Sequence, residues 1–106
     1  MKYCSNEEML IKQYIPNKSS MKKMTSFFYA FSDDTRLKIL FLLMMKPLCV
    51  GDIVSILNTN QTTVSHQLRI LKSLNLVACD RNGKNIIYYI KNANIENVFN
   101  EAVECF

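Results

Sequence analysis

The residues of this chain that are best equipped for chemistry lie between positions 61 and 74, where amides, hydroxyls, an imidazole and two cations surround an apolar repeat. Val64, Leu68 and Leu71 recur at helical spacing, which predicts a helix from Gln61 to about Leu74 with one packed face and one polar face. An α-helix fits the major groove of B-DNA, where each base pair presents its own donors, acceptors and methyl groups. The side chains that suit such base edges are Gln61, Thr62, Thr63, Ser65, His66 and Gln67.

Four cations accompany this polar face. Arg69 and Lys72 lie on the same predicted helix, and Arg81 and Lys84 lie further along the chain. Cations of this kind contact phosphates and position a protein on DNA without specifying a base sequence. The net charge is +4, whereas residues 92–106 carry acids and no cation, so the basic surplus coincides with the predicted reading elements. A polar helix face can also be merely solvated.

A helix-turn-helix is predicted around this segment. A short apolar-sided helix is expected at residues 50–57, followed by the polar turn Asn58-Thr59-Asn60. Asn60 has the short polar side chain that caps the start of a helix.

A β-hairpin is predicted immediately after the second of these helices. Residues 76–81 and 84–91 are rich in Val, Ile and Tyr, and Asn82-Gly83 is a preferred pair for a two-residue type I′ turn. A helix-turn-helix followed by such a wing describes a winged helix-turn-helix. The predicted fold class is therefore mainly α with a small β-hairpin.

The flanking segments divide the chain into an arm and one domain. Residues 1–19 are interpreted as an N-terminal arm with a short helix around residues 6–14, and residues 20–106 as the winged helix domain. Apolar stripes at helical spacing predict a helix over 21–31 and another over 95–106.

A central helix is predicted over residues 35–45, because its residues are apolar on nearly all sides. Ser32 is expected to cap it, with Asp33 and Asp34 in the first turn near the positive helix end.

Composition excludes several classes of protein. At 106 residues the chain can bury one core, and it has no uncharged apolar run of membrane-spanning length and no signal-peptide pattern, so we expect a cytoplasmic protein without a membrane partner. One histidine, two glycines and no Gly-rich phosphate loop do not predict an enzyme. The four cysteines form no CxxC pair and are expected to be thiols.

From about Phe31 to Ile90 the sequence resembles the ArsR/SmtB transcriptional repressors. The resemblance rests on the segments SDDTRLKIL, LCVGDI, TTVSHQLRIL and LVACDRNGKNIIYY. It implies a homodimer that occupies a near-palindromic double-stranded operator and leaves it when an inducer binds. It also implies that the first and last helices of the domain build the dimer interface, which accounts for the apolar stripes at 21–31 and 95–106.

The same resemblance implies two places for a metal inducer. One site lies on the last helix and uses Asp, His and Glu as ligands. At the matching positions this chain has Asn92, Asn94 and Cys105, and it ends before the final Glu. Because neutral amides are poor zinc ligands, we expect that site to be absent.

The second site joins the arm of one protomer to the helix before the turn of the other. Cys49 and Asp52 match that ligand pair, and Cys4 and Glu8 could supply the contribution of the arm. Two thiolates and two carboxylates suit Zn(II) or Cd(II), whereas As(III) would want a third sulfur. The same residues could instead be a helix cap, a first-turn carboxylate and parts of a disordered tail.

Other interpretations stay open. Cys79 and Cys105 could report oxidation, and the chain could be a DNA-binding regulator without any ligand. Winged helices can also dock proteins rather than DNA, since fold does not fix function.

Overall fold

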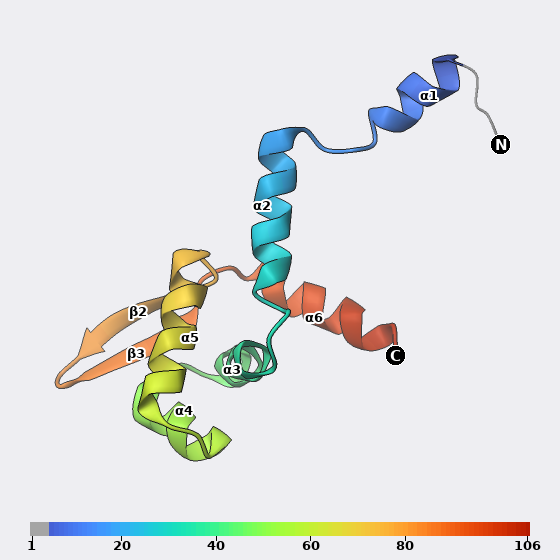
Figure 1. Cartoon of the computed structure of the whole chain (residues 1–106). Coiled ribbons are helices and arrows are strands. Elements are labelled where there is room, and N and C mark those ends of the chain that lie inside the picture. Colours follow the sequence, from blue (N-terminus) through green and yellow to red (C-terminus); the bar gives the residue numbers. More distant parts are fainter. Residues whose placement is uncertain (1–4) are drawn as a thin grey trace.

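The computed structural model describes residues 5–106 and shows a mainly helical chain with a small antiparallel sheet (Figure 1). In chain order the elements are α1 (Ser5–Lys12), α2 (Lys18–Tyr29), α3 (Asp34–Met45), β1 (Leu48–Cys49), α4 (Val50–Leu57), α5 (Gln61–Ser73), β2 (Val77–Asn82), β3 (Asn85–Ile90) and α6 (Asn94–Glu104). The winged helix-turn-helix prediction is confirmed. None of the helices within residues 5–106 is both long and apolar enough to cross a membrane.

The helix-turn-helix is formed by α4 and α5. Asn58 ends α4 in the left-handed conformation with φ 52°, and the Asn60 side chain accepts a hydrogen bond of 2.8 Å from the Thr63 backbone N–H. The predicted cap of α5 is therefore confirmed. Val64, Leu68 and Leu71 are buried, which fixes the opposite face of α5 toward solvent.

The sheet corrects two details of the sequence-based prediction. Its strand order is β1-β3-β2, so the hairpin carries a third, two-residue strand that is too short to leave a sequence pattern. Asn82 pairs with Asn85, which makes Gly83 and Lys84 the loop residues. Gly83 has φ 65° and Lys84 a negative φ, the distribution of a type II′ turn with glycine first rather than the expected type I′ turn at Asn82-Gly83.

The core is centred on α3, as predicted. Ile39, Leu40 and Leu43 are buried there against residues of α4, α5, β2 and α6. Its predicted cap was wrong, because Asp33 rather than Ser32 accepts the hydrogen bond from the Arg36 backbone N–H, at 3.0 Å. The Ser32 hydroxyl is already used, since it donates to the Tyr29 carbonyl at 2.7 Å.

The flanking helices pack little within one chain. No residue of α2 is buried, and α6 buries only Ile95 and Phe99. Figure 1 shows α1 projecting away from the other elements at the end of a linker, and the molecule measures 63 × 29 × 22 Å. The predicted helix of the arm is present, although it runs from Ser5 to Lys12 rather than over 6–14.

Candidate nucleic-acid interface and metal site

Most side chains predicted for base contact lie on the outward face of α5. Gln61, Thr62 and His66 are exposed, and Thr63 and Ser65 are half-buried. A shallow hollow of about 450 Å³ on this face is lined by Gln61, Thr62, Ser65, His66 and Arg69. The face therefore offers hydroxyl, amide and imidazole groups with a guanidinium one helical turn further along.

Gln67 lies differently from the other predicted base contacts. Its Oε1 accepts a hydrogen bond of 3.0 Å from Nη1 of Arg36, whose side chain is 5% exposed. Because this oxygen is engaged within the fold, Gln67 connects α5 to α3 and is a weaker candidate for a base contact than its neighbours.

Arg36 is a structural residue that the sequence analysis did not single out. Besides Gln67, its guanidinium donates to the Tyr29 carbonyl at 3.1 Å and to the Ala30 carbonyl at 3.4 Å. It also stacks on the Tyr29 ring, with 4.6 Å between Cζ and the ring centroid. All these partners are neutral. The available signal was an arginine in a helix that is mostly apolar, since such a cation must find several acceptors if it is buried.

The predicted phosphate contacts come from two elements. Arg69 and Lys72 are exposed on α5, and Arg81 and Lys84 are exposed at the tip of the wing. Lys72 Nζ donates to Cys79 Sγ at 3.3 Å and so connects the helix to β2. Each of these cations keeps donors free for a phosphate, because an ammonium has three N–H groups and a guanidinium five.

An acid also lies on the wing. The negative charge of the Asp80 carboxylate raises the pKa of the Tyr89 hydroxyl above its ordinary value of 10.0. Desolvation of the hydroxyl and its hydrogen bond to Asp80 act in the same direction. Tyr89 is therefore neutral and a hydrogen-bond donor at physiological pH.

The proposed metal ligands are only partly brought together within one chain. Cys49 is half-buried at the start of α4, and its backbone N–H donates to Asp52 Oδ2 at 3.4 Å, so these two residues are neighbours. Glu8 is exposed on α1, which Figure 1 places far from α4. Cys4 lies outside the described residues. Within residues 5–106 no three His, Cys, Asp or Glu side chains gather to hold a metal ion.

The remaining cysteines lie far from each other. Cys79 is on β2, whereas the exposed Cys105 ends α6, and Figure 1 shows these two elements on opposite sides of the molecule. A disulfide needs Cα atoms within about 7 Å, so this arrangement does not allow the pair to form within one chain. Asn92, one of the residues at the last-helix site, uses its Oδ1 to accept a local bond of 3.0 Å from the Asn94 backbone N–H.

Known proteins are similar to this chain in both sequence and fold. Residues 33–78 match the model of the bacterial regulatory protein arsR family. The chain is 32% identical over 115 residues to a transcriptional repressor SmtB homolog of Synechocystis sp., covering 95% of this chain and 87% of that protein. It is 40% identical over 81 residues to the cadmium resistance transcriptional regulatory protein CadC of Listeria innocua, covering 76% and 68% of the two chains.

The solved homodimeric winged helix-turn-helix DNA-binding domain of a possible ArsR-family regulator from Mycobacterium bovis has the same fold. The TM-score is 0.69 at 28% identity, over 83% of this chain and 88% of that one. The order of the elements, the exposed polar face of α5 and these likenesses agree: the chain belongs to the ArsR/SmtB family of winged helix-turn-helix transcriptional regulators.

Proposed function

We propose that the chain represses transcription by binding a double-stranded operator with α5 in the major groove and the β2–β3 wing against neighbouring phosphates. The observation that carries the proposal is the outward face of α5, which presents uncharged donors and acceptors while its other face is buried in the core. In this proposal Gln61, Thr62, Thr63, Ser65 and His66 contact bases, and Arg69, Lys72, Arg81 and Lys84 contact phosphates. Such a regulator works where the cell keeps its DNA, which for a bacterial repressor is the cytoplasm.

The proposed repressor is a homodimer that joins through α2 and α6. An apolar groove of about 330 Å³ lies between α2, α3 and α6, and Phe28, Phe41 and Val103 are among the exposed residues that line it. One recognition helix reads only a few base pairs, whereas two related by a two-fold axis, about 34 Å apart, read two half-sites. The solved relative from Mycobacterium bovis is described as homodimeric, which supports this arrangement.

The proposed inducer is Zn(II) or Cd(II), and in this proposal no cofactor is required for folding. Cys49 and Asp52 of one protomer would hold the ion together with Cys4 and Glu8 from the arm of the other. The donor set fits these borderline ions, and the Cys49–Asp52 pair already lies together at the start of α4. A bound ion would tie the arm of one protomer to the helix before the turn of the other. The CadC relative is named for cadmium resistance, which supports a metal inducer.

A mobility shift on the promoter region of the chain's own gene tests DNA binding and induction together. We expect a shifted complex whose affinity falls steeply as salt rises, because each phosphate contact releases counterions. Lys84→Glu and Arg69→Glu should each weaken binding, whereas Lys38→Glu, which reverses an exposed charge on α3, should not. Binding that does not depend on salt or on the α5 and wing cations would contradict the proposal.

The same assay tests the inducer when Zn(II), Cd(II), As(III) or peroxide is added. We expect Zn(II) or Cd(II) to release the DNA, and Cys49→Ser to abolish that release while leaving metal-free DNA affinity unchanged. Cys105→Ser, at the exposed end of α6, is the matched control and should still respond. An unchanged metal affinity in Cys49→Ser would show that the ion, if it binds, binds elsewhere.

A further inference from the structure

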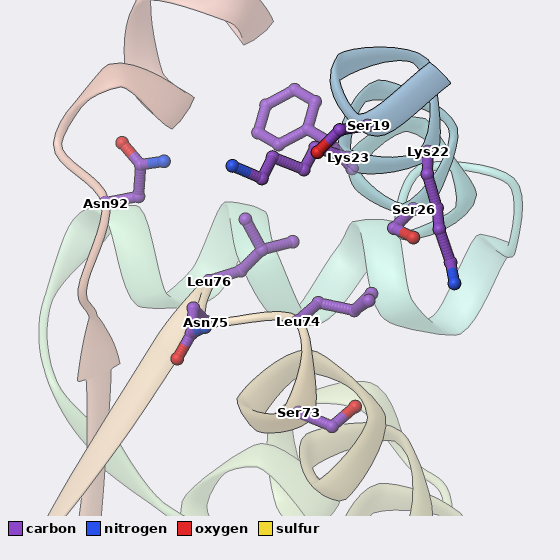
Figure 2. A pocket seen from close by; sticks show the side chains of 10 residues that line it. Ser19, Lys22, Lys23, Ser26, Ser73, Leu74, Asn75, Leu76 and Asn92 are labelled. Atoms are coloured by element: carbon purple, nitrogen blue, oxygen red, sulfur yellow. The ribbon is translucent and has the colours of Figure 1, made fainter.

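A cleft of about 470 Å³ lies between α2 and the corner where α5 turns into β2 (Figure 2). One wall is the face of α2 that carries Lys22, Lys23 and Ser26, and the other is formed by Ser73 to Leu76. Asn92, just after β3, closes one end. None of the proposed DNA or metal contacts lines this cleft.

The polar groups of the cleft are those that bind an anion. Lys22 and Lys23 contribute ammonium groups, Ser26 a hydroxyl and Asn92 an amide, and none of the described lining residues is acidic. The Ser73 hydroxyl already donates to the Ile70 carbonyl at 2.7 Å. Figure 2 shows the Lys23 side chain extending from α2 above Leu76 and toward Asn92. A further cation is close, because Lys91 Nζ donates to Asn75 Oδ1 at 3.4 Å. Clustered cations with hydroxyl and amide donors favour a carboxylate or a phosphate.

The floor of the cleft is apolar. Leu76 is buried, and Leu74 and Phe27 are half-buried beside it. A hydrated inorganic ion would leave the exposed parts of Leu74 and Phe27 uncovered, whereas a small organic anion could cover them with its apolar part. The lining therefore favours a ligand that has both an anionic group and an apolar group.

The two walls differ in how firmly they are held. The corner is closed by backbone hydrogen bonds from Leu76 N to Leu71 O at 3.1 Å and from Lys91 N to Leu76 O at 3.0 Å. In contrast, no residue of α2 is buried. A ligand in the cleft would thus add a contact between α2, which the proposed dimer interface also uses, and the end of the recognition helix.

We propose that this cleft binds a small organic anion with an apolar group, and that the bound anion changes DNA affinity by fixing α2 relative to α5. The second half of the proposal rests on the proposed function, because it needs α5 to read DNA. The first half concerns binding alone and is independent of it.

Direct binding is tested by titrating phenyl phosphate into the full-length chain and following amide shifts by NMR. We expect shifts at residues 73–76 and 92, and an affinity about tenfold lower for Lys23→Met, which corresponds to about 1.4 kcal/mol. Lys38→Met, which removes an exposed lysine of α3, should bind as wild type does. Phenol and inorganic phosphate each carry half of the recognised chemistry and should bind more weakly. Equal affinity of Lys23→Met and Lys38→Met would overturn the site.

The regulatory half is tested by repeating the DNA titration with and without phenyl phosphate. We expect the ligand to change the DNA affinity of wild type and Lys38→Met but not that of Lys23→Met. If Lys23→Met loses DNA affinity without ligand as strongly as Arg81→Met does, the cleft contacts a DNA phosphate and the effector proposal is wrong. A chain that binds phenyl phosphate through Lys23 but binds no DNA would overturn the proposed function while upholding the anion site.

Discussion

At the scale of single residues, Arg36 holds together parts of the chain that the DNA-reading face needs. Its buried guanidinium joins the end of α2 to Gln67 in the middle of α5, and its side-chain partners are all neutral. A buried donor that loses its acceptor costs about 1–3 kcal/mol. We therefore expect Gln67→Met, which keeps the length of the side chain and removes its oxygen, to lower the free energy of unfolding by that amount in urea titrations. Gln13→Met changes an exposed glutamine after α1 and should leave unfolding unchanged.

Equal free energies of unfolding for Gln67→Met and Gln13→Met would mean that the hydrogen bond between Arg36 and Gln67 contributes nothing to stability. This contact could not be predicted from the sequence, which is why Gln67 was placed among the predicted base contacts. Helical spacing puts Gln67 beside the exposed polar residues, and only the tertiary position of Arg36, 31 residues earlier, shows that its oxygen is used inside the fold.

At the scale of elements, the two glycines of the chain differ in whether their backbone conformation requires glycine. Gly83 begins the wing turn with φ 65°, a conformation that costs an L-residue about 1–2 kcal/mol, although an added Cβ would meet no atom within 4 Å. Gly51 lies in α4, where an added Cβ would make only an ordinary contact of 3.8 Å to Cys49 Sγ. We expect Gly83→Ala to lower the melting temperature and Gly51→Ala to raise it, because alanine favours a helix over glycine by up to about 1 kcal/mol. Calorimetry in which Gly83→Ala did not lower the melting temperature would contradict the turn assignment.

Sequence patterns predicted the helices better than the strands and caps. The apolar repeats of α4 and α5 located both helices almost to the residue, since each buries one regular face. β1 was missed because two residues cannot show an alternation, and its pairing with β3 is decided by the fold. The predicted turn was one residue too early, because Asn82-Gly83 and Gly83-Lys84 are both acceptable turn pairs and the pairing of Asn82 with Asn85 selects the second.

At the scale of the whole molecule, one chain is more extended than a compact chain of its length. Its radius of gyration is 18.1 Å, whereas a compact chain of this length would have a value of about 13 Å. In this extended chain α2 and α6 have exposed apolar faces. The arm projects from the same side of the molecule as α2 (Figure 1). A second copy that covers these faces would remove apolar surface from water and place two recognition helices on one DNA duplex.

Two exposed apolar residues allow this proposed dimer to be tested with a matched pair. Phe28 on α2 lines the apolar groove and Ile56 lies on α4, and each is 55% exposed in the single chain. Phe28→Glu would bury a carboxylate in the dimer interface, so we expect the dimer to dissociate about 100-fold more readily and operator affinity to fall with it. Ile56→Glu adds the same charge outside that groove and should leave the dimer intact. Sedimentation velocity over a concentration series measures both, and a Phe28→Glu variant that stays dimeric at the concentrations where wild type does would place the interface on another face.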